Sequence, residues 1–427
     1  MNVAVIGTGY VGLVSGTCLA EKGHNVTCVD IDEEKVRKLR EGISPIYEPG
    51  LEELITKNVE AGRLFFTTDY VRAVPEADVV LVGVGTPPNQ DGSANTRYVE
   101  DAARKIAKYL QGYTVIANKS TVPVGTRDLV KNIISEIFSG AYDVVSNPEM
   151  LREGCAVKDF LEPARIIIGT DSEQAGERML EMYASFDCPK LVMHPRSAEL
   201  TKYAANSFLA TKISFINEVA HLAEEVGADI EEVAEGMGTD PRIGKKFLRA
   251  GLGWGGSCFP KDVRAMLHMG KKANQRMPIV EASFIVNDRA RKRVVERLEQ
   301  IVENLSGKKV CMLGLAFKNN TDDTRESAAL VLAEHFVNAG ASVSAYDPKA
   351  KMYDEELASR IQRHGCPYRA SEGADMVVIA TEWDEFRSLD LDRLKQKMEG
   401  DILMDARNIL NHEEAERKGF RYFRVGK

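Results

Sequence analysis

The residue with the most reactive surroundings in the sequence is a cysteine, Cys258, in the stretch Gly255–Asp262. Pro260 is favoured in the first turn of a helix, so a helix is predicted to begin there. Cys258 would then precede a positive helix end with Lys261 nearby, and both favour the thiolate over the thiol. A thiolate can add to an aldehyde and permit its oxidation to an acid, whereas an inert packing cysteine is the alternative.

A glycine-rich turn near the start of the chain predicts a dinucleotide site. Its sequence is Gly7-Thr8-Gly9-Tyr10-Val11-Gly12, between a strand pattern and a helical pattern. Such glycines permit a tight turn and bring a pyrophosphate close to the helix N-terminus. Asp30 ends the second strand pattern, where a carboxylate binds ribose hydroxyls and repels a 2′-phosphate. We therefore expect NAD rather than NADP, with a turn that only packs as the alternative. Lys35 can reach the adenosine side or be a solvated lysine.

Further polar residues occur where a site can use them. Lys202 and Asn206 are four residues apart in a helical pattern and share a face that can hold an oxyanion, although a solvated face is the alternative. Two segments, Ser120–Thr126 and Asn147–Glu153, each follow a predicted strand, where a parallel sheet places its ligands. The second segment offers two carboxylates four residues apart, Glu149 and Glu153, each of which can by itself be a helix cap or a surface turn.

The elements that must position these residues alternate in type over the first segment. Strands are predicted at Val3–Ile6, Val26–Val29, Val79–Val84, Val115–Ala117, Val144–Val145 and Ile166–Ile168, and helices at Val11–Glu21, Glu33–Arg40 and Arg97–Leu110. This alternation predicts a parallel sheet covered by helices on both faces. Helical patterns then run from Glu199 to Val226 and from about Ile279 to Leu305. Long helices between two domains often pack against a second copy, so we expect a homo-oligomer.

Strand patterns return after Ser306 and repeat those of the first segment. Lys309–Gly314 is similar to Asn2–Gly7, Gly340–Asp347 to Gly23–Asp30, and Ala374–Ile379 to Ala77–Val82. The glycine fingerprint is absent, so this domain is expected to hold a smaller nucleotide, with Lys318 and Arg325 as phosphate ligands or as parts of a charged surface loop. The predicted fold class is α/β: two Rossmann-like doubly wound domains, residues 1–195 and 306–427, are joined by a helical connector and dimerisation domain, residues 196–305. A ligand cleft is expected between the two α/β domains.

Composition excludes several classes of protein. The chain has 427 residues, too many for one core, and a net charge of −8 without a basic block, which argues against nucleic acid as a partner. Its seven cysteines contain no C-x-x-C pair, which predicts reduced thiols in the cytoplasm. Histidine spacing predicts no metal site. No apolar run reaches membrane-span length, and we expect neither a signal peptide nor a membrane partner.

Together these motifs resemble the UDP-glucose/GDP-mannose dehydrogenase family over nearly the whole chain. The resemblance includes the glycine turn, Ser120–Pro123, Asn147–Glu149, Lys202–Asn206, Arg242–Gly244, Gly255–Asp262, Phe317–Lys318 and Thr324–Ser327. It implies oxidation of the small-molecule substrate UDP-glucose with two NAD and water to UDP-glucuronate and two NADH.

The resemblance also implies a role for individual residues. Cys258 would be the nucleophile, Lys202 and Asn206 would stabilise oxyanions, Asp262 would assist thioester hydrolysis, and Thr121 and Glu149 would orient a water. NAD would contact Gly7, Gly9, Tyr10, Val11, Gly12, Asp30, Lys35, Thr86, Thr121, Glu153, Lys261 and Arg325. The nucleotide sugar would contact Glu149, Leu151, Arg152, Glu153, Lys202, Asn206, Phe247, Arg249, Gly251, Gly255, Phe317, Lys318 and Arg407, with Arg242 reaching the substrate of the neighbouring subunit.

Three other functions stay open from the sequence. The same chemistry can act on GDP-mannose or a UDP-N-acetylhexosamine, although Phe259 is a weak indication of UDP-glucose. An NAD-sensing protein without turnover would not need Cys258, Lys202 and Asp262. A two-electron hydroxyacid dehydrogenase would explain neither Cys258 nor the C-terminal α/β domain.

Overall fold

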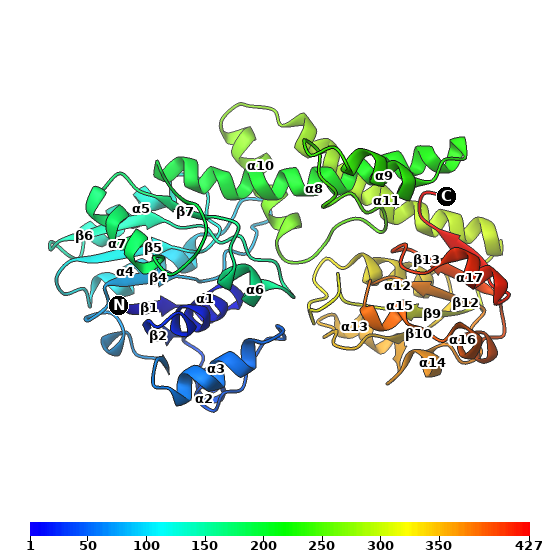
Figure 1. Ribbon diagram of the computed structural model, residues 1–427, viewed down its shortest axis with the longest axis horizontal. Coiled ribbons are helices and arrows are strands. Elements are labelled where there is room, and N and C mark those ends of the chain that lie inside the picture. The colour runs from blue at the N-terminus through cyan, green and yellow to red at the C-terminus, as the bar shows by residue number, and fades with distance from the viewer. The chain divides into compact units, whose positions relative to one another are not determined.

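The computed structural model describes all residues from Met1 to Lys427. The chain divides into two compact units, Met1–Ala205 and Asn206–Lys427. Each unit contains one twisted sheet flanked by helices, and one long helix is shared by the two units (Figure 1). The predicted α/β class with two Rossmann-like sheets and a long central helix is confirmed.

The sheet of the first unit has the order β3-β2-β1-β4-β5-β6-β7-β8. Its strands are β1 (Asn2–Ile6), β2 (Asn25–Val29), β3 (Leu64–Thr67), β4 (Val79–Val82), β5 (Thr114–Asn118), β6 (Tyr142–Ser146), β7 (Ile166–Gly169) and β8 (Lys190–Met193). The sheet is not wholly parallel as predicted, because β7 is antiparallel to β6. The segment after β6 folds back beside β7, where Asn147 Nδ2 donates to the carbonyl of Ile167 at 2.7 Å.

Helices cover both faces of this sheet, and successive residues of β1 belong to different cores. Val3 and Val5 pack with α1 (Tyr10–Glu21), α2 (Glu33–Arg40), α3 (Leu51–Glu60), α6 (Ala156–Leu161) and α7 (Glu173–Met182). Ala4 and Ile6 pack with the cluster under the short helix η1 (Tyr70–Arg72), α4 (Arg97–Ala107) and α5 (Thr126–Ser135). Burial on both faces explains why these strands are continuously apolar.

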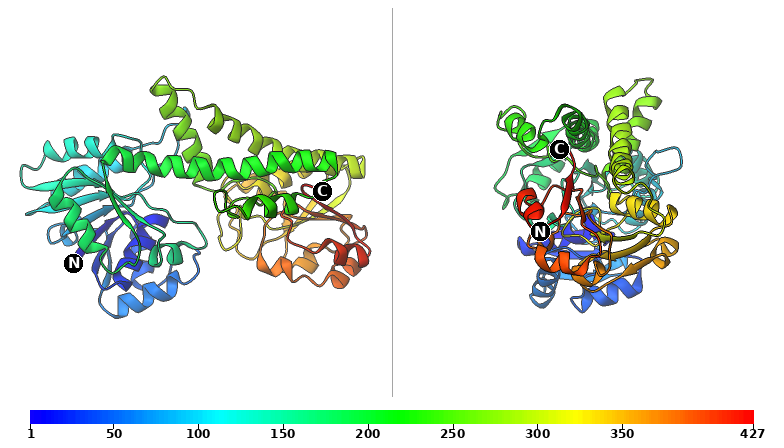
Figure 2. Two further views of the ribbon diagram at one scale, coloured as in Figure 1. Left: turned by 45° about the horizontal axis from the view of Figure 1, so that its top comes forward. Right: turned by 90° about the vertical axis from the view of Figure 1, so that its right-hand side faces the viewer.

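The central helices are α8 (Pro195–Val226), α9 (Ile230–Gly238), α10 (Phe259–Lys272) and α11 (Pro278–Val302), and α8 begins before the predicted Glu199. Two of these four helices, α8 with 32 residues and α11 with 25, are longer than most in globular proteins. In the second unit α11 lies beside α8 (Figure 2), with Ser214 Oγ donating to the carbonyl of Ser283 at 2.6 Å. None of the helices is both long and apolar enough to cross a membrane.

The second sheet repeats the topology of the first six strands, with the order β11-β10-β9-β12-β13-β14 and all pairs parallel. Its strands are β9 (Lys309–Leu313), β10 (Ser342–Tyr346), β11 (Ile361–Arg363), β12 (Met376–Ile379), β13 (Ile402–Asp405) and β14 (Arg421–Arg424). Its helices are α12 (Ala328–Asn338), α13 (Glu355–Ser359), α14 (Pro367–Ala370), α15 (Asp384–Arg387), α16 (Leu391–Lys397) and α17 (His412–Arg417). The similarity of the two domains extends to individual hydrogen bonds. The N–H of Gly7 donates to the carbonyl of Val29 at 2.7 Å, and the N–H of Gly314 donates to the carbonyl of Tyr346 at 2.8 Å.

Candidate cofactor and catalytic sites

The glycine turn after β1 has the shape that a pyrophosphate requires. Gly7 has φ +94°, and a Cβ on Gly12 would lie 1.9 Å from the carbonyl oxygen of Gly7, so a larger residue does not fit there. Gly9 caps α1, and no atom lies within 4 Å of the position that its Cβ would take. The first turn of α1 carries neither a side-chain cap nor an acidic residue. Its N–H groups are therefore available to an anion.

Asp30 follows β2 beside this turn. Its Oδ2 accepts from Thr8 N–H at 2.9 Å and from Lys35 Nζ at 3.0 Å. Burial opposes ionisation, but the hydrogen bonds from Thr8 and Lys35 outweigh it and hold the pKa of Asp30 below its ordinary value. The group is therefore a carboxylate at neutral pH. Lys35 is paired with it and is not the freely solvated lysine that the sequence left as an alternative.

A buried carboxylate that the sequence analysis missed, Glu48, joins this turn to a distant segment. Glu48 accepts from the Tyr10 hydroxyl, from Gly154 N–H at 2.7 Å and from Ala156 N–H at 2.7 Å. Burial raises the pKa of Glu48. The contact fixes the end of the segment that contains Leu151, Arg152 and Glu153. An acidic residue in the loop before Pro49-Gly50 gives no sequence signal for such a contact.

Lys202 and Glu149 form an ion pair inside the first unit. Lys202 Nζ lies 2.8 Å from Glu149 Oε1, and the two side chains are only 4% and 5% exposed. The other oxygen of Glu149 accepts from Leu151 N–H at 2.5 Å. Burial opposes ionisation of Glu149, but the Lys202 ammonium and these hydrogen bonds hold its pKa below the usual range. The solvated helix face that was the alternative for Lys202 is therefore wrong.

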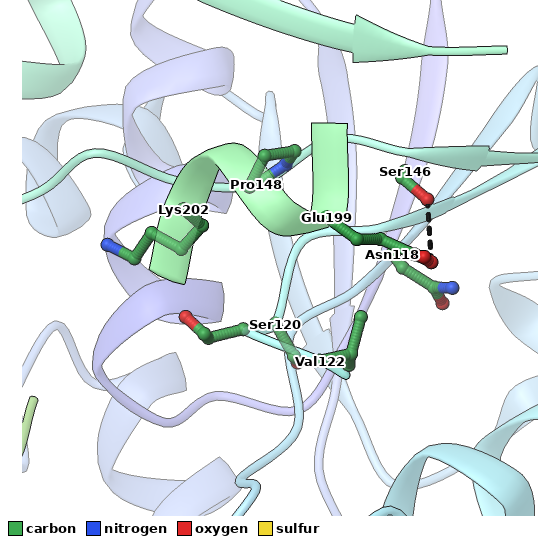
Figure 3. Close-up of a pocket in the computed structure, with 8 residues that line it drawn as sticks. Asn118, Ser120, Val122, Ser146, Pro148, Glu199 and Lys202 are labelled. Atoms are coloured by element: carbon green, nitrogen blue, oxygen red, sulfur yellow. Dashed lines mark hydrogen bonds between the residues drawn. The ribbon is translucent and has the colours of Figure 1, made fainter. Parts of the chain in front are cut away.

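Thr121 and Lys202 both line a cavity of about 10 Å³, and Figure 3 labels Lys202 on its wall. On α8, Glu199 points toward Ser146, whereas Lys202 points away from it. Glu199 accepts from Ser146 Oγ at 3.0 Å and from Gly125 N–H at 2.6 Å, which anchors the loop after β5. The Thr86 hydroxyl donates to the carbonyl of Thr121 at 2.8 Å. The structure thus brings together Thr86, Thr121, Glu149 and Lys202.

Cys258 caps α10 in the second unit. The helix begins at Phe259, one residue before the predicted Pro260, and the Cys258 side chain is half-buried. The Ser257 hydroxyl lies 3.7 Å from Cys258 Sγ. The ammonium of Lys261 donates to the Asp262 carboxylate at 2.5 Å. Its positive charge is therefore shared between Asp262 and a thiolate at Cys258. The N-terminal helix end remains a source of positive potential at Cys258.

Asp262 connects α10 to α8. It is buried and accepts from Asn206 Nδ2 at 2.6 Å. Asn206 is itself buried, so the solvated-face alternative fails for this residue too. A carboxylate held by one amide and one ammonium can accept a proton from water or stay charged near a reacting carbonyl.

Two of the predicted nucleotide-sugar residues of the second unit, Gly251 and Phe317, lie beside Arg407. Its guanidinium donates to the carbonyls of Ala380 at 2.8 Å, Phe317 at 3.2 Å and Gly253 at 3.4 Å. The Gly251–Gly256 loop also joins the Arg325 segment, because Gly256 N–H donates to its carbonyl at 3.1 Å.

Other predicted residues are nearer the surface. Lys318 Nζ lies over the Phe317 ring, 5.4 Å from its centroid, and Phe247 has φ +66°. Arg152 is paired with Asp159, Arg249 is exposed, and Arg242 is exposed and paired with Asp240.

Comparison with known proteins gives these sites a context. Residues 1–187 match the NAD binding domain of the UDP-glucose/GDP-mannose dehydrogenase family, residues 196–289 its central domain and residues 311–412 its UDP binding domain. The chain belongs to this family. This family member is therefore an NAD-dependent oxidoreductase with a UDP-sugar binding domain, and NAD is its cofactor.

Individual relatives of this family member align over 93% or more of their lengths. It is 48% identical over 436 residues to UDP-glucose 6-dehydrogenase of Rhizobium meliloti, with 100% of both chains covered. It is 45% identical over 429 residues to UDP-glucose 6-dehydrogenase TuaD of Bacillus subtilis, covering 100% of this chain and 93% of the relative. The structure of a UDP-glucose dehydrogenase from Pyrobaculum islandicum has a TM-score of 0.91 and 40% identity, with coverages of 100% and 97%.

Proposed function

We propose that this dehydrogenase oxidises UDP-glucose to UDP-glucuronate, converting UDP-glucose, two NAD and water into UDP-glucuronate and two NADH. The observation that carries the choice of sugar is 48% identity with a UDP-glucose 6-dehydrogenase over complete chains. A solved UDP-D-ManNAc dehydrogenase of Pyrococcus horikoshii is only 29% identical, with a TM-score of 0.87 and coverages of 100% and 99%. Oxidation of GDP-mannose or a UDP-N-acetylhexosamine is the less supported alternative.

The proposed chemistry has two oxidations with Cys258 between them. NAD held by the glycine turn, Asp30 and Lys35 would supply the hydride acceptor for both oxidations. Loss of the first hydride from the sugar hydroxymethyl group leaves an aldehyde, to which the Cys258 thiolate adds. The thiohemiacetal loses the second hydride, and water cleaves the resulting thioester to the acid and free thiol.

The other polar residues have supporting roles in this proposal. Lys202 and Asn206 hold the oxyanions, Thr121 and Glu149 orient the water that moves protons, and Asp262 assists hydrolysis. The glycine turn, Asp30, Lys35, Thr86, Glu153, Lys261 and Arg325 hold NAD. Leu151, Arg152, the Phe247–Gly251 loop, Gly255, Phe317, Lys318 and Arg407 hold the UDP-sugar.

The test is a panel of nucleotide sugars with NADH counted for each molecule of product. We expect UDP-glucose to give the highest kcat/KM, with two NADH formed for each UDP-glucuronate. One NADH per sugar would contradict the four-electron reaction. Preference for GDP-mannose or a UDP-N-acetylhexosamine would contradict the sugar but not the chemistry.

Asp30 should make the enzyme prefer NAD strongly over NADP. A 2′-phosphate beside this carboxylate costs several kcal/mol, so we expect kcat/KM for NAD to exceed that for NADP by about 10²-fold or more. Asp30→Ser should lower this ratio of kcat/KM for NAD to kcat/KM for NADP. Asp32→Asn changes a neighbouring carboxylate that caps α2, and it should leave the ratio unchanged. Equal kcat/KM values in the wild type would contradict the assignment of Asp30.

We further propose a homodimer in the cytoplasm, with residues 196–305 as the dimerisation domain between two nucleotide-binding domains. Phe208, Phe215 and Leu222 recur every seven residues on α8 and are exposed, Phe208 by 66%. A row of large apolar side chains on one helix is typical of a surface that a second copy covers. The free cysteines fit a reducing compartment.

Mixed dimers test whether Arg242 acts on the neighbouring subunit. Arg242→Ala and Cys258→Ala chains should each be nearly inactive, but a hybrid dimer has one complete site. An equal mixture should therefore recover about a quarter of wild-type activity, because half the dimers are hybrids with one working site of two. The control mixes Arg242→Ala with an Arg242→Ala/Cys258→Ala chain, which leaves no complete site. Verified hybrids without activity would refute a role across the dimer.

A further inference from the structure

A buried lysine at the end of β5, Lys119, has no part in the chemistry described above. Its Nζ lies 3.2 Å from Asn147 Oδ1 and 3.3 Å from the Tyr183 hydroxyl, and 5.6 Å from the ring centroids of Phe160 and Tyr183. It forms no ion pair within 4 Å. It shares with Glu149 the wall of a cavity of about 40 Å³. Burial lowers the pKa of Lys119 to about 8, with the Glu149 carboxylate opposing the shift.

The neighbours of Lys119 do not need its hydrogen bonds. Asn147 Oδ1 also accepts from the Tyr183 hydroxyl at 2.7 Å, and Asn147 Nδ2 donates to the carbonyl of Ile167. Removing the lysine would therefore leave each neighbour with a hydrogen-bond partner, because the Tyr183 hydroxyl would still donate to Asn147 Oδ1. What Lys119 alone supplies at this place is a positive charge, and burying that charge without a carboxylate partner costs stability.

The groups around Glu149 show where this charge acts. Lys202 on α8 faces one oxygen of Glu149, and the backbone N–H of Leu151 faces the other. Lys119 approaches from β5 across the cavity, whose wall also holds Asp159 and Arg165, both half-buried. Asp159 is paired with Arg152. Lys119 is thus the second fully enclosed cation near Glu149.

We infer that Lys119 is a positioning residue that keeps Glu149 ionised when Lys202 turns to a substrate oxyanion. The inference rests on the proposed function, in which Lys202 stabilises oxyanions. Whenever Lys202 shares its charge with the substrate, Glu149 loses part of its counter-charge inside a buried site. Lys119 does not contact the substrate in this scheme and stays in place throughout the cycle. Glu149 therefore remains a carboxylate that can orient water and accept a proton.

The test is the pH profile of kcat/KM for UDP-glucose in Lys119→Met and Lys119→Gln. Both remove the charge, and Gln keeps a polar group for Asn147 and Tyr183. We expect the acidic limb to move up by about one pH unit in both variants, because an opposite charge no longer favours the ionised Glu149. Tyr183→Phe keeps the charge and removes the two hydrogen bonds of the Tyr183 hydroxyl, and its acidic limb should stay at the wild-type position. Thermal unfolding of Lys119→Met at neutral pH should occur at or above the wild-type temperature.

Other results overturn the inference. An unmoved acidic limb in either folded Lys119 variant would show that its charge does not reach Glu149. An equal shift in Tyr183→Phe, or unfolding of both Lys119 variants at lower temperature, would make Lys119 a structural residue. In a Glu149→Gln background, Lys119→Met should cause no further loss of activity, and additive losses would also count against the coupling. A wild-type chain inactive on UDP-glucose would refute the proposed function instead, and this activity is measured first.

Discussion

The Cys258→Ala variant should form UDP-glucuronate far more slowly than the wild type. Its steady-state turnover should fall by roughly 10³-fold or more. The side chain of alanine cannot hold an aldehyde as a thiohemiacetal, so the second hydride has no donor and the reaction ends at the aldehyde. Product analysis with NADH counting measures this directly. Wild-type rates with two NADH per sugar would make Cys258 only a packing residue.

Cys258→Ser separates the two halves of the reaction. Serine has a much higher pKa than cysteine, so the first addition is slow, and an oxygen ester hydrolyses less readily than a thioester. Turnover should be lost, and intact-protein mass spectrometry should find a sugar ester trapped on the introduced serine. Cys366→Ser is the matched control, because Cys366 precedes α14 and lies outside the proposed site. It should leave turnover and product unchanged.

The parts of the sites that local sequence could predict are those that depend on local geometry. The glycine turn, Asp30 and the helix after Cys258 each follow from a strand or helix signal a few residues away. The repeat of the first sheet in the second was predictable for the same reason, because buried parallel strands and their terminal aspartates keep their spacing. The antiparallel β7 was missed because a short apolar run carries no information about strand direction.

The buried polar contacts were not predictable because their partners come from distant parts of the chain. Glu48 meets the amide of Gly154, which is 106 residues away, and Glu149 meets Lys202 on another element. Lys119 directly precedes the predicted Ser120–Thr126 segment, and its position in the sequence indicates only a lysine at the end of a strand. No residue near it in the sequence indicates that aromatic rings and an amide enclose it. Such residues become candidates only when their burial is known.

Removing the charge of either Lys202 or Glu149 should destabilise the first unit and abolish activity. Removing both charges should restore stability but not activity. Removal of one partner of a buried pair costs about 3–5 kcal/mol because an unpaired charge remains buried. We therefore expect Lys202→Met to unfold at a clearly lower temperature than the wild type. Lys202→Met/Glu149→Gln should recover most of that loss while remaining inactive, since both proposed catalytic groups are gone.

The pH dependence of this loss tests its electrostatic origin. In the wild type the pKa of Glu149 is lowered, so its pairing stabilises the fold above the ordinary carboxyl pKa and this stabilisation fades as pH falls. In Lys202→Met burial acts with less opposition and the pKa of Glu149 should rise. The deficit relative to the wild type should then shrink between neutral pH and about pH 5, as Glu149 takes up a proton in the variant.

Arg196→Met is the control for this comparison, because Arg196 lies on α8 and forms an exposed pair with Asp128. An exposed pair contributes about 0–1 kcal/mol, so this variant should stay close to the wild type in both stability and activity. If Lys202→Met resembled Arg196→Met in stability, the buried pair would not hold the loop after β6 in place. If the double variant were active, neither Lys202 nor Glu149 would belong to the catalytic machinery, and the oxyanion would have to be held by Asn206 without them.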